Sequence, residues 1–85
     1  MTQDEIRAAV EEALHSVAPD TRETVIEPGV NFRDQFDIDS MDFVGFVLAF
    51  EKEIGVTIPE IDYPLLSSMD GCVRYIDSQQ QPAPG

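Results

Sequence analysis

Apolar residues recur at helical spacing in three segments of the chain, and the segment from residue 40 to residue 54 has the clearest pattern. Its main stripe follows the i, i+3, i+4, i+7 spacing of one helix face and consists of Phe43, Phe46, Val47, Phe50 and Ile54. A second apolar row, formed by Met41, Val44 and Leu48, lies well off the first at about 100° per residue. The segment therefore has one face for a core and a second apolar face with no evident use in so small a domain.

Two further helices are expected on either side of this segment. Thr2 and Glu5 form a capping box, which marks a helix start, so the first helix is expected over residues 3–17. Near the C-terminus the same helical spacing recurs in Met69, Cys72, Val73 and Ile76. Gly71 interrupts this last pattern and, on propensity alone, weakens the helix by about 1 kcal/mol relative to alanine.

The segments between these helices lack a sustained period. The connection over residues 18–39 is long for a compact domain, so its apolar side chains are expected to anchor it. These anchors are Val25, Ile26, Val30, Phe32, Phe36 and Ile38. Residues 60–66 are expected to form a short helical turn, limited by Pro64 because proline fits only the first turn of a helix. This turn is expected to cover the open side of the bundle with Ile61, Leu65 and Leu66.

Together these elements predict an all-α fold, a small bundle of three main helices plus one short helix, with a long loop between helices one and two. The 85 residues allow a single domain, which we expect over residues 1–78. Residues 79–85 are polar and rich in proline, and we expect them to form a disordered C-terminal tail.

The charge of the chain restricts its partners. With 17 acidic and 5 basic residues the net charge is -12, which argues against nucleic acid because phosphate binding needs the opposite sign. A basic protein surface is the natural complement and would speed encounter with this chain. On charge alone, however, the favoured interpretation is an acidic surface that only keeps a small protein in solution.

The single cysteine, Cys72, excludes an internal disulfide, and we expect a cytoplasmic protein. The N-terminal residues are polar and acidic and show no signal peptide. The longest apolar patch, residues 43–50, is too short to span a bilayer, so no membrane insertion is expected.

The candidate chemistry lies at the tetrapeptide of residues 39–42, Asp-Ser-Met-Asp, where the long loop ends and the central helix begins. Ser40 could simply cap the helix, and Asp39 could take that role as easily. Alternatively, a hydroxyl at a helix tip is open to modification without disturbing the core.

This tetrapeptide resembles the Asp-Ser-Leu motif of acyl carrier proteins, a family whose motif serine carries a 4′-phosphopantetheine arm. The resemblance extends over residues 3–77. The acidic helix end and Ile-Pro step of residues 51–59 and the last helical segment also resemble the family. The resemblance implies that Ser40, with Asp39 as its motif neighbour, receives the arm from coenzyme A. The enzyme that transfers it would be a phosphopantetheinyl transferase, the holo-synthase. The thiol of the arm would carry an acyl group as a thioester, and the chain itself would not be an enzyme.

The resemblance also assigns the two faces of the central helix. The expected partner-binding residues are Met41, Asp42, Val44, Leu48 and Glu51. The residues expected to line the core, where the family can shelter an acyl chain, are Phe43, Phe46, Val47 and Phe50. Three phenylalanines leave little free volume, so a small or absent cavity is expected before any chain is bound.

Three departures from the family pattern point to a specialised member of the family, not the housekeeping fatty-acid carrier. Asp37 stands where the family usually has glycine, and aspartate tolerates the left-handed conformation better than most residues. Gly45 replaces a central glutamate, and Lys52 stands where another acidic residue is common. The expected pathways are fatty acid, polyketide or related specialised biosynthesis, with a monomeric carrier that meets acyl-loading and acyl-using enzymes through basic or apolar docking patches.

Other classes of function fit less well. A calcium-binding EF-hand starting at Asp37 would place Met41 and Leu48 at ligand positions, so no metal site is expected. A hydrolase using Ser40 lacks a base, since the one histidine, His15, is expected at an exposed surface position. Two alternatives stay open: a peptidyl or aryl carrier protein, and an acidic helical adaptor that is never modified at Ser40.

Overall fold

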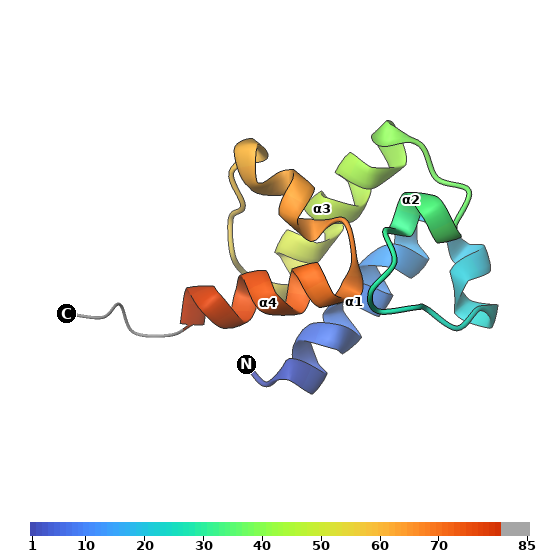
Figure 1. Ribbon diagram of the computed structural model, residues 1–85. Coiled ribbons are helices and arrows are strands. Elements are labelled where there is room, and N and C mark those ends of the chain that lie inside the picture. The colour runs from blue at the N-terminus through green and yellow to red at the C-terminus, as the bar shows by residue number, and fades with distance from the viewer. Residues whose placement is uncertain (81–85) are drawn as a thin grey trace.

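The computed structural model describes residues 1–80, and within them the chain forms helices and no strand (Figure 1). Its elements are the helices α1 (Gln3–Val17), α2 (Phe32–Gln35), α3 (Ser40–Ile54) and α4 (Met69–Gln80) and the 3-10 helices η1 (Pro19–Glu23) and η2 (Glu60–Leu66). The all-α prediction is confirmed, with three main helices and one short helix in the expected places. The long loop contains two further short elements, η1 and α2, which span too few residues to produce a period.

The ends of the main helices follow the signals in the sequence. At the start of α1, the Thr2 hydroxyl accepts the Glu5 N–H at 3.1 Å and the Glu5 carboxylate accepts the Thr2 N–H at 2.8 Å. At the end of α3, Gly55 adopts φ 71°, the left-handed conformation that glycine takes without steric cost. At the start of α4, the Ser68 hydroxyl accepts the Gly71 N–H at 3.0 Å.

Helix α1 is the element against which the bundle is assembled, because it packs on both α3 and α4. Figure 1 shows α4 crossing α1, with α3 and η2 together on one side of that pair. The buried core is drawn from every helix: Ile6, Ala9, Val10, Ala13, Leu14, Phe32, Ile38, Phe46, Val47, Phe50, Ile58, Leu66, Met69, Cys72, Val73 and Ile76. The start of α3 is therefore held in place by a single continuous core.

Aromatic side chains form the centre of the α3 packing. The ring of Phe46 meets Phe32 of α2 edge-on at a centroid distance of 5.1 Å. The same ring stacks on Phe50 at 5.9 Å and on Phe43 at 6.0 Å. Because α2 immediately precedes the start of α3, the Phe32 contact anchors the end of the long loop to the core.

Three predicted anchors are wrong. Val25 is 86 % exposed, because the chain leaves η1 in an extended conformation at Thr24 and it is Ile26 that packs against the core. Ile61 and Leu65 are also exposed, whereas Leu66 is buried and Tyr63 packs against the core. The reason is that η2 is a 3-10 helix, whose three residues per turn place positions 63 and 66 on the same face.

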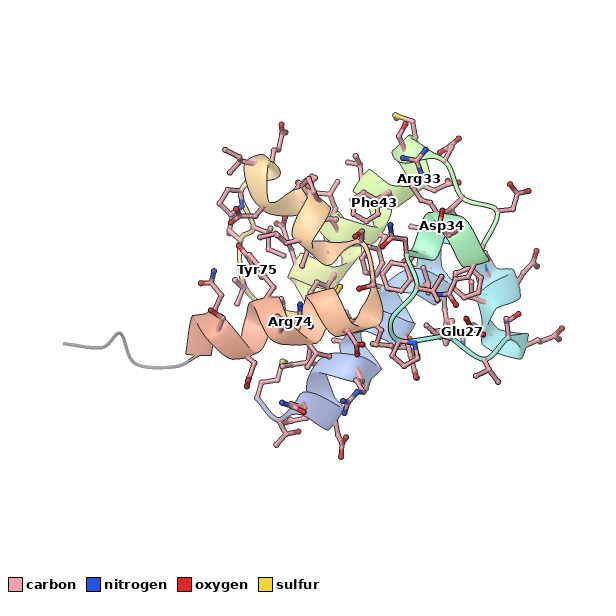
Figure 2. All side chains as sticks on the ribbon, viewed as in Figure 1. Glu27, Arg33, Asp34, Phe43, Arg74 and Tyr75 are labelled. Carbon is pink, nitrogen blue, oxygen red and sulfur yellow. The ribbon has the colours of Figure 1, made fainter. Side chains whose placement is uncertain are left out.

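The link between η2 and α4 depends on close polar contacts. Tyr75 of α4 donates a hydrogen bond of 2.7 Å to the Asp62 carboxylate, and Figure 2 shows its side chain between the two elements. Burial, together with this hydrogen bond, raises the pKa of Tyr75 to about 12, so the hydroxyl keeps its proton. The Cys72 thiol donates to the Leu66 carbonyl at 3.4 Å. The position of η2 is thus set by α4.

Helix α4 continues through Gln80, so residues 79 and 80 belong to the helix and not to the tail we expected from residue 79. Glutamine is a good helix former, and the first proline after the helix is Pro82. The rest of the predicted tail, residues 81–85, lies outside the described residues. Within residues 1–80, none of the helices combines the length and apolarity that crossing a membrane requires.

Candidate functional site

The first turn of α3 is capped by aspartates and not by Ser40. Asp39 accepts the Asp42 N–H at 2.8 Å, and the Asp42 carboxylate accepts the Asp39 N–H at 3.2 Å. Asp39 is therefore the N-cap residue, and Ser40 is the first residue of the helix. Ser40 is exposed, and its hydroxyl makes no hydrogen bond to the described residues. Its free hydroxyl is therefore not explained by helix capping.

Replacing the two residues separately tests this division of roles. We expect Asp39→Ala to lower the free energy of unfolding by about 1 kcal/mol, because the Asp42 N–H loses its acceptor. We expect Ser40→Ala to change it by less than about 0.5 kcal/mol, as at an ordinary surface position. Urea denaturation followed by circular dichroism gives both values. A larger loss for Ser40→Ala than for Asp39→Ala would show that the serine is the cap.

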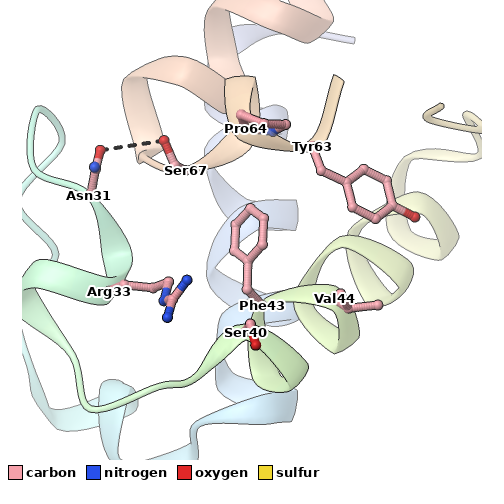
Figure 3. A pocket seen from close by; sticks show the side chains of 8 residues that line it. All are labelled: Asn31, Arg33, Ser40, Phe43, Val44, Tyr63, Pro64 and Ser67. Atoms are coloured by element: carbon pink, nitrogen blue, oxygen red, sulfur yellow. Dashed lines mark hydrogen bonds between the residues drawn. The ribbon is translucent and has the colours of Figure 1, made fainter. Parts of the chain in front are cut away.

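An open groove of about 550 Å³ lies beside Ser40. Residues of α2, α3, η2 and the adjoining chain line it, and the close-up in Figure 3 shows them: Asn31, Arg33, Ser40, Phe43, Val44, Tyr63, Pro64 and Ser67. Across one end of the groove, the Ser67 hydroxyl lies 3.4 Å from Oδ1 of Asn31. An exposed hydroxyl thus lies next to an open groove.

The expected core-lining residues divide between two environments. Phe46, Val47 and Phe50 are fully buried in a filled core, as expected from their size. Phe43 is only partly buried and lines the groove beside Ser40. The small or absent cavity was expected in the interior among these side chains, whereas the groove lies at the surface, between α3 and η2.

The second apolar row of α3 faces outward. Met41 is 77 % exposed, Leu48 50 % and Val44 39 %, so this row takes no large part in the core. Of the two acidic residues expected beside them, Glu51 is partly buried and Asp42 is engaged in the cap. We call Met41, Val44 and Leu48 the exposed apolar row.

Several groove residues carried no signal in the sequence. Asn31 and Arg33 belong to the long loop and its single-turn helix, while Tyr63, Pro64 and Ser67 belong to η2 and its end. Neither segment shows a helical period, so nothing in the pattern brought them to Ser40. The adjacent Tyr63 and Pro64 were the only feature of the sequence to indicate that residues 60–66 present a structured face.

The structure shows the surroundings of two of the three departures from the family pattern, Asp37 and Gly45. Among residues 1–80 only Gly55 has a positive φ, so the turn at Asp37 does not use the left-handed conformation. A Cβ on Gly45 would lie 3.2 Å from Cγ1 of Val17, tighter than ordinary contact. Gly45 therefore lies close to the end of α1.

Groups that could support catalysis lie elsewhere or are inert. His15 is partly buried, contrary to our expectation, with Nδ1 unpaired, and it does not line the groove. Burial raises the pKa of the Cys72 thiol, so it stays a neutral core residue. Residues 1–80 contain no group of three or more side chains that could hold a metal ion.

The described residues thus form a small helical domain with an exposed serine at the start of a helix, beside an open groove. The family model described as the phosphopantetheine attachment site matches residues 4–65. The chain belongs to this family, that of the acyl carrier proteins. The cofactor of the family is phosphopantetheine, and its members are carriers and not catalysts.

Curated relatives and a solved structure agree with this assignment. The chain is 35% identical over 79 residues to the acyl carrier protein of Zymomonas mobilis, covering 93% of this chain and 95% of that protein. It is 32% identical to the meromycolate extension acyl carrier protein of Mycobacterium tuberculosis, over 99% of this chain and 72% of that one. The solution structure of an acyl carrier protein from Anaplasma phagocytophilum superposes with a TM-score of 0.74 at 27% identity, covering 98% and 97% of the two chains.

Proposed function

We propose that Ser40 is the attachment point of the 4′-phosphopantetheine arm and that this protein carries acyl intermediates on it as thioesters. The observation that supports this proposal is the Ser40 hydroxyl, which is exposed at the start of α3 and takes no part in the cap. The residues present fit the group, because an ester at this hydroxyl removes no contact of the fold. When bound, the arm supplies the thiol that forms the thioester, and the protein supplies attachment and orientation.

The exposed apolar row is the proposed docking surface for partner enzymes. Members of the family interact with a phosphopantetheinyl transferase and with acyl-handling enzymes. In this protein the row begins directly beside Ser40, with Met41, and continues along the outer face of α3. With a net charge of -12 around it, an apolar patch rimmed by basic residues is the complementary partner surface. We propose that the carrier acts as a monomer in the cytoplasm.

The proposed pathway is a dedicated one within fatty acid, polyketide or related biosynthesis. The exposed Lys52 near the end of α3 and the uncharged Gly45 distinguish this chain from the usual family pattern. A peptidyl or aryl carrier is the alternative cargo class, and an unmodified acidic adaptor is the alternative without cargo. The relatives' names favour acyl cargo.

The test is the intact mass of the purified protein before and after incubation with coenzyme A and a broad-specificity phosphopantetheinyl transferase. We expect the wild type to gain one phosphopantetheine and Ser40→Ala to gain none. Ser67→Ala is the matched control, because Ser67 lines the same groove and should leave the gain intact. Absence of a gain in folded wild-type protein would leave the adaptor as the assignment, and a gain in Ser40→Ala would move the site elsewhere.

A further inference from the structure

Arg33 is the one cationic side chain among the residues that line the groove beside Ser40. It extends from α2 toward the first turn of α3, and Figures 2 and 3 show it on the same side of the molecule as Phe43. The side chain is exposed, and within residues 1–80 it makes no ion pair and no side-chain hydrogen bond. A guanidinium with no partner of its own therefore lies beside the proposed attachment point.

The negative charges around Ser40 give the position of Arg33 its significance. The chain has only 5 lysines and arginines, and the loop end around Ser40 carries Asp37, Asp39 and Asp42. A phosphodiester on Ser40 would add a further negative charge to this group of carboxylates. Asp39 and Asp42 are each already hydrogen-bonded to a backbone N–H, so their charges are fixed next to the hydroxyl. Arg33 is the group in the groove that can balance the added charge.

The chemistry of arginine fits this role. A planar guanidinium presents two parallel N–H donors to the oxygens of a phosphate, an arrangement that lysine cannot reproduce. Arg33 and Ser40 line one groove, so an arm on Ser40 would begin beside the guanidinium. Beyond the phosphate, the groove offers the apolar rings of Phe43 and Pro64 to the carbon chain of the arm.

We propose, resting on the proposed function of Ser40, that Arg33 binds the phosphodiester of the attached arm and holds the start of the arm in the groove. The arm then has one end docked and only its far, thiol-bearing part free to move. This arrangement differs from the freely swinging tether that the carboxylates around Ser40 suggest by themselves.

The experiment compares the apo and holo forms of the ¹⁵N-labelled protein by NMR, with intact mass confirming the arm on each sample. The chain has four arginines, Arg7, Arg22, Arg33 and Arg74, whose Nε–H signals can be followed separately. We expect attachment of the arm to shift the Arg33 Nε–H signal and to leave the other three within experimental error. An unshifted Arg33 signal in a sample whose mass shows the arm would overturn the inference while leaving the proposed function intact.

The second readout is the ³¹P signal of the arm at about 0.05 M and 0.5 M salt, because a surface ion pair is screened as salt rises. We expect the wild-type signal to move with salt and that of Arg33→Met to stay still, with Arg33→Lys between them. Arg74→Met is the matched control, since it removes the same charge from an exposed position on α4 and should behave as wild type. An identical salt response in Arg33→Met and wild type would exclude Arg33 as the partner of the phosphate.

Discussion

Phe46→Ala is expected to lower the free energy of unfolding by about 3–5 kcal/mol, the cost of truncating a fully buried aromatic side chain. The ring of Phe46 contacts Phe32, Phe43 and Phe50, so its loss leaves a cavity bounded by three other rings. A chain of 85 residues has a total stability of about 4–13 kcal/mol. This single substitution therefore removes a large part of what holds α2 and α3 together.

Urea denaturation followed by circular dichroism measures the effect. Leu48→Ala is the matched control, because Leu48 lies on the same helix but is 50 % exposed, and we expect a change within about 0.5 kcal/mol. The two variants together test the division of α3 into a core face and an exposed apolar row. Equal losses for Phe46→Ala and Leu48→Ala would contradict that division.

Gly71→Ala is expected to destabilise the protein by about 1–3 kcal/mol, although alanine is the better helix former by about 1 kcal/mol. A Cβ at this position would overlap the backbone carbonyl oxygen of Leu65, and a backbone atom cannot move aside as a side chain can. The expected response is displacement of η2 from α4. This displacement would stretch the hydrogen bond from Tyr75 to Asp62 and shift the groove wall that contains Tyr63.

Denaturation gives the stability of Gly71→Ala, and amide hydrogen exchange in residues 60–66 reports the loosening of η2. Gly45→Ala is the control for helix propensity, since its Cβ would meet only a methyl group of Val17 at 3.2 Å. We expect that variant to stay within about 1 kcal/mol of wild type, because the gain in propensity offsets a small shift of Val17. A stabilised Gly71→Ala protein would show that η2 does not pack as closely as described.

At Gly71, helix propensity favours alanine, whereas the close contact with Leu65 opposes it. This difference illustrates what the sequence can and cannot predict. Periodicity located the three main helices, and a local rule located the Thr2 cap, because a capping box depends on neighbours within one turn. The contact of Gly71 with Leu65 joins two different elements, and no local rule contains it. The serine was identified in the same local way, from a motif at a loop-to-helix junction.

The groove beside Ser40 could not be predicted for the same reason. Its walls come from α2, α3 and η2, and two of these are too short to impose a period on the sequence. Ile61 and Leu65 were predicted to cover the bundle because the helical period of residues 60–66 could not be determined from the sequence. The 3-10 geometry of η2 reverses that assignment and turns Tyr63 inward. The sequence does not show that Arg33 lies beside Ser40, because its position depends on how α2 packs against α3.

The burial of Cys72 has a practical consequence for labelling chemistry. Its thiol lies in the core with a raised pKa, so alkylating reagents meet no reactive sulfur in the folded protein. Ser40→Cys would create a single exposed thiol at a position whose side chain makes no contribution to the helix cap. Maleimide or haloacetamide probes, and synthetic arms ending in either group, can then be installed at one defined atom without an enzyme and without first removing the native cysteine.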